Sequence, residues 1–415
     1  MSWKKVKLSQ ICDIQIGRTP DRNNSSYWGK GYSWVSIRDL KSDTVFTTKE
    51  EITDAAVREC NCKLIPANTL LMSFKLSIGK LAFTKEPVYT NEAIAALLIK
   101  DRSKVYNRFL YYALQVADLL RDTDRAVMGA TLNKKKLAEI EIILPPLEEQ
   151  KRIAQVLDKA DRLRQKDRQL LQHYDQLLQS VFLDMFGDPG INSKSWNTCL
   201  LGDIIETLTD YHANGSYEVL RDNVTLLTTK NYALMVRTTD LENNNFTDNV
   251  IYIDEHAYNY LKKTKVYGGE IIINKIGSAG KVYLMPNLET PVSLGMNAFM
   301  LRFDQSRATS EFLYYYLTSE FATTEIQKRV KGAVTKTINK DSIREIPVLL
   351  PPLQLQEKFI AVIKKIVKQK AAVETTLKGS NNLFQSLLQK AFKGELQLKD
   401  EKPTAKPKFV VSSIL

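Results

Sequence analysis

The sequence predicts a mixed α/β (α+β) fold in which two globular domains are each followed by a long helix, as two copies of one plan. Three observations lead to this prediction. Leu144-Pro145-Pro146-Leu147 returns 206 residues later as Leu350-Pro351-Pro352-Leu353. Short β-rich runs between turn residues fill the segment before each copy. After each copy, apolar residues recur at spacings of three and four over about 40 residues, which is typical of a long amphipathic helix.

The repeat extends well beyond this tetrapeptide. The matching segments keep their order along the chain: Trp3 and Trp196, VSIRDL at 35–40 and VRTTDL at 236–241, Ile78-Gly79-Lys80 and Ala279-Gly280-Lys281, and FLYY at 109–112 and 312–315. A displacement of about 200 residues is far longer than the roughly 20 to 50 residues of solenoid repeats. The two halves are therefore predicted to be duplicated domains.

Each half is predicted to mix strands and helices. Apolar or alternating runs separated by Gly, Asn, Pro and Ser predict strands in the first half over 32–37, 70–74, 80–83 and 93–99, and helical spacing predicts a helix over 106–120. The second half repeats this plan, with strands predicted over 225–229, 250–253, 270–274, 281–285 and 298–303 and a helix over 311–321.

The prolines set the domain boundaries, because proline is tolerated at a helix start and excludes helical geometry from the residue before it. We place globular domains at 1–146 and 188–352, helical spacers at 147–187 and 353–397, and a flexible tail at 398–415. A helix of 40 residues is about 60 Å long, more than one small domain covers. We expect the spacers to pair as an antiparallel coiled coil around a pseudo-two-fold axis, with a bend or fraying at Gly379-Ser380-Asn381-Asn382.

The alternative is that each long helix packs only on its own domain. In the paired arrangement, outer faces of the helices remain available for other subunits. The apolar residues that we predict to dock partners are Leu147, Ile153, Leu157, Leu177, Leu353, Phe359, Ile363 and Leu387.

Composition limits the class of protein. A hydrophobic fraction of 44% with 26% charged residues is ordinary for a globular protein. Because neither a signal peptide nor an apolar run of about 18 residues is present, we expect a cytoplasmic protein without a membrane partner. The net charge of +12 favours a polyanionic partner, above all nucleic acid, although a generally solvated basic surface is the simpler alternative. The 4 cysteines predict reduced, structurally incidental thiols.

Patterns typical of enzymes are missing. The 3 histidines have no companions at ligand or triad spacing. Ala279-Gly280-Lys281 lacks both the earlier glycine and the following Ser or Thr of a phosphate-binding loop, and no Gly-x-Gly-x-x-Gly opens a helix after a strand. We therefore expect a non-catalytic chain that carries no cofactor and no metal of its own.

Basic residues alternate with aromatic and small polar residues in the turn-rich parts of both domains. Such mixtures suit nucleic acid, because Arg, Asn and Gln bind base edges while Lys binds phosphates. The predicted DNA contacts are Arg18, Thr19, Lys30, Arg38, Lys75, Lys80, Arg125, Lys134 and Lys135 in the first half, and Tyr211, Lys230, Tyr232, Arg237, Lys275, Ser278, Lys281 and Lys336 in the second.

The whole plan resembles the specificity subunit of type I restriction-modification systems. The residues that carry the resemblance are Ile16 to Pro20 with Tyr27-Trp28, Trp34, Arg38-Asp39-Leu40, Gly79-Lys80, Gly129-Ala130-Thr131 and Leu144 to Leu147 with Glu149-Gln150, together with Thr239-Asp240-Leu241, Gly277 to Lys281, Gly332-Ala333 and Leu350 to Leu353 with Gln356. The duplicated order of these motifs is more specific than any one of them.

This resemblance implies two target-recognition domains that bind a bipartite, asymmetric DNA sequence. It also implies partners: double-stranded DNA, two methyltransferase subunits and two restriction (motor-nuclease) subunits, with S-adenosylmethionine, ATP and Mg²⁺ bound by those subunits. The second half departs from the first at 208–216, where the Gly17 to Pro20 motif is missing, so the two half-sites are expected to differ. A duplicated protein-interaction scaffold is the alternative function, and a stand-alone enzyme is a more distant one.

Overall fold

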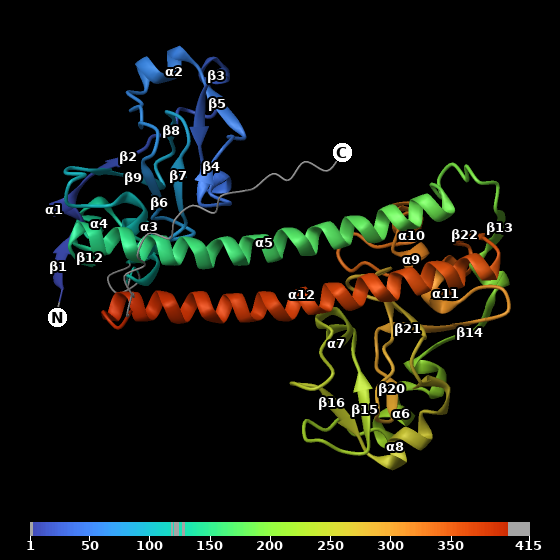
Figure 1. The fold of residues 1–415 in the computed structure, drawn as a ribbon. Helices are drawn as coiled ribbons and strands as arrows, with labels where there is room; N and C mark the ends of the chain where they lie inside the picture. The colour runs from blue at the N-terminus through green and yellow to red at the C-terminus, as the bar shows by residue number, and fades with distance from the viewer. Residues whose placement is uncertain (1–2, 118, 120–123, 127–128, 397–415) are drawn as a thin grey trace, which may run out of the picture. The chain divides into compact units, whose positions relative to one another are not determined.

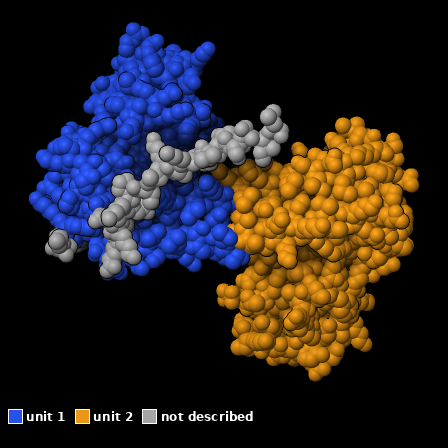
Figure 2. Space-filling view, viewed as in Figure 1, with its two compact units in different colours: residues 1–168, 375–415 blue, residues 169–374 orange. Residues whose placement is uncertain are grey.

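The computed structural model of this 415-residue chain describes residues 3–117, 119, 124–126 and 129–396. The predicted tail at 398–415 therefore lies outside the described residues. The chain divides into two compact units, which Figure 2 colours separately: unit 1 comprises Met1–Arg168 and Thr375–Leu415, and unit 2 comprises Gln169–Glu374. Each unit thus contains one globular domain and part of both long helices.

Unit 1 contains two main sheets with the strand orders β2-β9-β6-β7-β4 and β5-β3-β8, while β1 pairs antiparallel with β12 and β10 with β11. Its strands are β1 (Lys4–Lys7), β2 (Cys12–Ile16), β3 (Trp28–Val35), β4 (Thr44–Val45), β5 (Glu50–Ile52), β6 (Leu70–Ser73), β7 (Leu81–Thr84), β8 (Tyr89–Thr90), β9 (Ile94–Ile99), β10 (Asp124–Ala126), β11 (Gly129–Thr131) and β12 (Glu141–Leu144). Its shorter helices are α1 (Leu8–Ile11), η1 (Ser25–Tyr27), η2 (Ile37–Asp39), α2 (Asp54–Glu59), α3 (Asn107–Val116) and α4 (Lys134–Glu139).

Unit 2 has a similar plan, with two four-stranded sheets of the orders β14-β21-β18-β19 and β16-β15-β20-β17 in place of the five- and three-stranded sheets of unit 1, and the antiparallel pair β13-β22. Its strands are β13 (Asn197–Leu200), β14 (Ile205–Asp210), β15 (Ala233–Val236), β16 (Ile251–Ile253), β17 (Lys265–Val266), β18 (Ile271–Asn274), β19 (Val282–Leu284), β20 (Val292–Leu294), β21 (Ala298–Phe303) and β22 (Pro347–Leu350). Its shorter helices are η3 (Leu201–Asp203), η4 (Tyr211–Asn214), α6 (Tyr217–Asn223), α7 (Thr238–Asn243), α8 (Glu255–Tyr260), η5 (Lys262–Thr264), α9 (Ser310–Leu317), α10 (Glu320–Arg329) and α11 (Lys340–Arg344).

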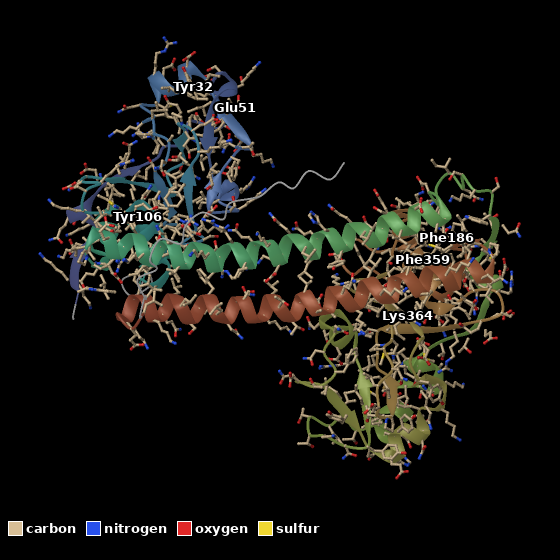
Figure 3. The ribbon with its side chains drawn as sticks, in the orientation of Figure 1. Tyr32, Glu51, Tyr106, Phe186, Phe359 and Lys364 are labelled. Carbon is tan, nitrogen blue, oxygen red and sulfur yellow. The ribbon has the colours of Figure 1, made fainter. Side chains whose placement is uncertain are left out.

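The two long helices are α5 (Leu147–Phe186) and α12 (Leu353–Lys393), and they pack antiparallel within each unit (Figure 1). In unit 1, the Arg164 guanidinium lies 3.5 Å from the ring centroid of Phe384, and the Ser380 hydroxyl donates to Asp167 at 2.8 Å. In unit 2, the rings of Phe186 and Phe359, labelled in Figure 3, are 5.1 Å apart. The predicted fold class is confirmed.

Each globular domain also covers the apolar stripes of these helices. The main core of unit 1 joins sheet residues such as Leu70 and Leu97 to Phe109 of α3, Leu157 of α5 and Phe384 of α12. Burial of one such side chain contributes about 1.5–3 kcal/mol. Phe182 and Phe186 of α5 likewise belong to the main core of unit 2. Each long helix is therefore stabilised by both domains and by the other long helix, and the alternative that each packs only on its own domain is wrong.

A buried glutamine ties each domain to its long helix. In unit 1, Gln150 accepts from the Tyr106 backbone N–H at 2.8 Å and donates to the carbonyl oxygens of Lys104 and Pro145, each at 2.8 Å. In unit 2, Gln356 accepts from the Thr309 N–H at 2.9 Å and donates to the carbonyl oxygens of Arg307 and Pro351. In both halves the glutamine lies six residues after the first Leu of Leu-Pro-Pro-Leu. Its one amide satisfies three backbone groups.

Three expectations about elements were wrong. The segment 225–229 forms no strand, because Leu227 makes only an isolated bridge to Tyr252. The helix predicted over 311–321 is divided between α9 and α10, because Ser319 caps the start of α10 with its side chain. No interruption occurs at Gly379, since α12 is continuous from Leu353 to Lys393.

Candidate nucleic-acid interface

Two loops of unit 2 form one surface feature, which we call the unit 2 loop pair: residues 275–281, between β18 and β19, and residues 331–337, between α10 and α11. Backbone bonds join them, because Gly277 N donates to Lys336 O at 3.0 Å and Ile338 N donates to Lys275 O at 3.1 Å. Four of the predicted DNA contacts therefore lie together on this loop pair: Lys275, Ser278, Lys281 and Lys336.

Short-range backbone bonds and two glycines fix these loops. Gly280 N donates to Asn274 O at 2.8 Å, and Lys331 and Thr337 exchange two bonds of 2.8 Å. Gly280 has φ +84 and lies against Ile326, while at Gly332, with φ +105, a Cβ would collide with the carbonyl oxygen of Thr335. Only glycine adopts such conformations without strain. The turn signals in the sequence thus give two rigid, exposed loops.

Five lysines surround the loop pair, and three of them bind carboxylates. Lys275 and Lys340 lie 2.8 Å and 3.1 Å from Asp210, and Lys281 pairs with Glu242. Burial raises the pKa of Asp210, but hydrogen bonds from both lysines outweigh burial and hold that pKa below its ordinary value. The hydrogen bond to Glu242 raises the pKa of Lys281.

The other two lysines, Lys331 and Lys336, have exposed side chains. Within the described part of the chain, neither makes an ion pair. The loop pair borders two hollows. The lining of the first, of about 500 Å³, includes Lys281 and Lys336. The lining of the second, of about 250 Å³, includes Lys275, Arg329 and Lys331. This arrangement can hold phosphate oxygens, because uncompensated ammonium groups gain most from an anionic partner.

Unit 1 contains an equivalent loop between β6 and β7, at residues 74–80. Gly79 N donates to Ser73 O at 2.9 Å, and Leu132 N donates to Phe74 O at 3.0 Å, which matches the bond between Ile338 and Lys275 in unit 2. Lys80 is exposed and Lys75 is half-buried. Lys134 and Lys135 are exposed at the start of α4, two residues after Leu132. We call residues 74–80 and 132–135 the unit 1 loop pair.

The other predicted contacts of unit 1 lie apart from this loop pair. Arg18 is exposed, but its guanidinium donates to Cys60 O at 2.9 Å, and Thr19 donates to Glu92. Lys30 lies exposed on β3 and Arg38 exposed on η2. Arg125 lies in β10, and its side chain is outside the described residues.

In unit 2, four predicted contacts lie outside the loop pair. Lys230 is exposed, and Tyr232 is 42% exposed with its ring 5.6 Å from that of Tyr258. Arg237 donates to Asp240 at 2.6 Å and to Asn249 O at 2.7 Å. Tyr211 is only 7% exposed and packs among Leu220, Ala233 and Leu261, so its ring belongs to a core rather than to the surface.

Two basic residues were not among the predicted contacts: Lys340 beside the unit 2 loop pair, and Arg22 elsewhere in unit 1. Lys340 lies 206 residues after Lys134, so the repeat register could have identified it. Arg22 stacks on the rings of Trp28 and Trp34, at 3.8 Å and 5.0 Å from their centroids, and no sequence spacing indicates this contact.

The predicted docking residues are mostly covered by the chain itself. Ile153, Leu157, Phe359 and Ile363 are at most 2% exposed and belong to the cores. Leu147, Leu353 and Leu387 are half-buried, whereas Leu177 is 43% exposed. Only the last of these offers a large apolar surface to a partner.

The described residues contain neither a metal-binding cluster nor a helix that could span a membrane. Within residues 3–117, 119, 124–126 and 129–396, no three His, Cys, Asp or Glu side chains are grouped to hold a metal ion. Among the helices that the structure describes, none is long and apolar enough to cross a membrane. The four cysteines of the chain, Cys12, Cys60, Cys62 and Cys199, are free thiols.

The chain matches known proteins over both halves. The family model described as "Type I restriction modification DNA specificity domain" matches residues 1–173 and 194–379. The type I restriction enzyme MjaIX specificity subunit of Methanocaldococcus jannaschii is 24% identical over 422 residues, which cover 96% of this chain and 94% of that protein. The EcoR124I/EcoR124II specificity subunit of Escherichia coli is 30% identical over 171 residues, 39% of this chain and 41% of that protein.

Solved structures show the same fold. The crystal structure of a type I restriction-modification S subunit from M. genitalium has a TM-score of 0.57 at 17% identity, covering 96% of this chain and 97% of that one. A solved structure described as "Structural basis underlying complex assembly and conformational transition of the type I R-M system" has a TM-score of 0.54 at 19% identity. The match covers 95% of this chain and 98% of that one. At these identities the likeness concerns the fold alone.

Proposed function

We propose a function on the premise that the chain belongs to the family of type I restriction modification DNA specificity proteins, whose model matches both of its halves. The chain is accordingly a DNA specificity subunit of a type I restriction-modification system. What we add is how it binds. Each unit carries one loop pair with exposed lysines, and this duplication is the observation that carries the proposal. We infer that each loop pair holds one segment of double-stranded DNA, so that the target is bipartite.

The two loop pairs differ at their exposed apolar residues, which supports an asymmetric target. In unit 1, Leu76 is 66% exposed beside Lys75, whereas in unit 2 Val334 is 98% exposed between Lys331 and Lys336. Apolar side chains among phosphate-binding lysines suit contact with the thymine methyl group in the major groove. We propose that these residues contribute to base preference, while the lysines position the duplex.

Partner subunits are proposed on the same premise. Leu170 and Leu177 lie seven residues apart on α5 within unit 2 and are 41% and 43% exposed. Seven-residue spacing places them on one side of the helix, as docking onto a partner helix requires. We propose that methyltransferase subunits, and restriction subunits where present, dock on the long helices. Catalysis, S-adenosylmethionine, ATP and Mg²⁺ then belong to those subunits.

We also propose that the lengths of α5 and α12 determine how many unspecified base pairs separate the two half-sites. Removal of seven residues from each helix should change this spacer and leave both half-sites unchanged. Mapping of the methylated sites in a strain that carries the shortened chain measures both quantities. An unaltered spacer would refute this part of the proposal.

Mapping of N6-methyladenine across the genome, with and without this gene, tests the function itself. The proposal expects one bipartite, asymmetric motif to be methylated only when the gene is present. As a control, a strain with an intact gene but without the cognate methyltransferase should also lose the motif. A protein-interaction scaffold without DNA specificity would leave the methylated motifs unchanged when this gene is removed.

A further inference from the structure

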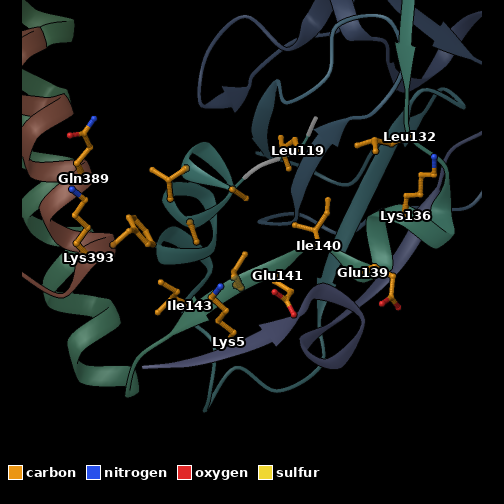
Figure 4. A pocket seen from close by; sticks show the side chains of 15 residues that line it. Lys5, Leu119, Leu132, Lys136, Glu139, Ile140, Glu141, Ile143, Gln389 and Lys393 are labelled. Atoms are coloured by element: carbon orange, nitrogen blue, oxygen red, sulfur yellow. The ribbon is translucent and has the colours of Figure 1, made fainter. Parts of the chain in front are cut away.

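A cavity in unit 1 lies where α12 ends. Its volume is about 460 Å³, and Figure 4 shows that α12, α4 and the strand β12 contribute side chains to it. Most of the lining is apolar, while charged residues such as Lys5 and Glu141 also border it. The lining residues used below are Ala113, Ile142, Ile143, Gln389, Phe392 and Lys393.

The repeat shows what kind of group this cavity lacks. Phe109-Leu110-Tyr111-Tyr112-Ala113 of α3 aligns with Phe312-Leu313-Tyr314-Tyr315-Tyr316 of α9, so Ala113 occupies the place of Tyr316. Tyr316 is 1% exposed, and its hydroxyl donates to the carbonyl oxygen of Pro347 at 3.1 Å. Pro347 faces Leu200 across its strand pair just as Glu141 faces Lys7 in unit 1. In unit 2, an aromatic ring therefore fills the position that alanine leaves empty in unit 1.

The surroundings of the two positions also correspond. Phe392 packs on Phe109 with ring centroids 5.3 Å apart, as Phe186 packs on Phe312 at 5.0 Å. After Phe186 the chain continues to Trp196, whose indole donates to Phe186 O at 2.8 Å. In unit 1 the corresponding Trp3 packs against the core, with its ring 4.0 Å from a Cβ placed on Gly394. After Lys393 the described chain continues only to Leu396, which packs against the core of unit 1. The cavity thus opens beside the point where residues 397–415 begin.

We propose that the C-terminal segment of this chain occupies the cavity, with the ring of Phe409 in the place that corresponds to Tyr316. Phe409 is the only aromatic residue after Phe392, and Val410 and Val411 follow it. Twelve residues lie between Leu396 and Phe409. The thirteen Cα–Cα steps can span up to about 45 Å, so the segment is long enough to reach the cavity. Covalent attachment also gives the segment a millimolar effective concentration. The segment acts as a clasp that holds the end of α12 on the first domain.

Amide hydrogen exchange of the full-length chain tests the clasp. Phe409→Ala should raise the exchange rates of Ile142, Ile143 and Gln389 to Lys393 by roughly tenfold, which corresponds to about 1.4 kcal/mol. Phe46→Ala is the matched control, because Phe46 is a 66% exposed phenylalanine of the same unit. Unchanged exchange in Phe409→Ala would overturn the proposal.

A second variant makes the test independent of folding defects in one mutant. Ala113→Tyr should fill the cavity from within, as Tyr316 does, and displace Phe409. Phe409→Ala should then lower the thermal midpoint of the wild-type chain but not that of Ala113→Tyr. Equal effects of Phe409→Ala in both backgrounds would place Phe409 elsewhere and contradict the proposal. Neither measurement depends on DNA binding, so failure of the clasp leaves the proposed function untouched.

Discussion

The lysines around the unit 2 loop pair differ in whether their ammonium groups are already paired with a carboxylate. Lys275, Lys281 and Lys340 each bind a carboxylate of their own unit, whereas Lys331 and Lys336 have exposed side chains without an ion pair among the described residues. A paired ammonium must break its ion pair or share it before it gains a phosphate. The two exposed lysines should therefore contribute most to DNA binding by unit 2.

Replacement of both exposed lysines tests this ranking. Lys331→Gln with Lys336→Gln should weaken DNA binding and lower the slope of log affinity against log salt by about 2, because each phosphate contact contributes roughly one counterion. Titration of the assembled complex with target DNA at several salt concentrations measures the slope. Lys194→Gln, an exposed lysine outside the loop pair, is the control. An unchanged slope in the double variant would remove these lysines from the interface.

Asp210 couples the loop lysines to acid stability. Its pKa is held below the ordinary value of about 3.9 by Lys275 and Lys340 despite burial. A lowered folded-state pKa stabilises the fold above the ordinary pKa, and this stabilisation is lost as the pH falls through the folded-state value. The free-energy difference between wild type and Asp210→Asn should thus be constant near pH 6 and shrink below about pH 4.

Urea unfolding followed by circular dichroism between pH 6 and pH 3 measures this difference. Asp222→Asn removes an exposed carboxylate that pairs with Arg221 and should show little change over the same range. A difference between wild type and Asp210→Asn that stays constant down to pH 3 would show that Asp210 is not preferentially ionised in the fold.

At the scale of elements, the joint between each domain and its long helix rests on one glutamine. Gln150 and Gln356 are fully buried, and each satisfies three backbone groups. Gln150→Leu should lower the free energy of unfolding by about 2–4 kcal/mol, because three backbone groups lose their partner and the bond to the Pro145 carbonyl oxygen is buried. Gln356→Leu should do the same in unit 2.

Chemical denaturation of the full-length chain checks these values. Gln155→Leu supplies a matched substitution on the same helix, since Gln155 is exposed, and it should change stability by less than about 0.5 kcal/mol. If Gln150→Leu lowered the free energy of unfolding no more than Gln155→Leu does, the buried amide would not stabilise the joint between domain and helix.

Elements with strong local signals were predictable from the sequence, and those that depend on distant partners were not. The spacing after each Leu-Pro-Pro-Leu predicted both long helices, and the apolar runs predicted β6, β9, β18 and β21. β14 was not predicted, because its central residues Glu206, Thr207 and Thr209 are polar and become a strand by pairing with β21. Likewise, Lys281 and Lys336 were predicted separately, but the bond from Gly277 to Lys336 that brings their loops together joins segments far apart in sequence.

At the scale of the whole molecule, the chain is one plan used twice, with different residues at corresponding places. Both units have two main sheets, five- and three-stranded in unit 1 and both four-stranded in unit 2, and the same glutamine joint to a long helix. They differ in the residues that emerge from the loop pairs and in the ring of Tyr316, which unit 1 lacks. A duplicated scaffold with divergent loops is what separate recognition of two unlike DNA segments requires.

Exchange of one domain tests this modular account most directly. Residues 1–143 would be replaced by the corresponding domain of a relative with a known target, and N6-methyladenine would be mapped across the genome of the host. The account predicts that one half-site changes to that of the donor, while the other half-site and the spacer stay the same. A change in both half-sites, or in neither, would contradict it.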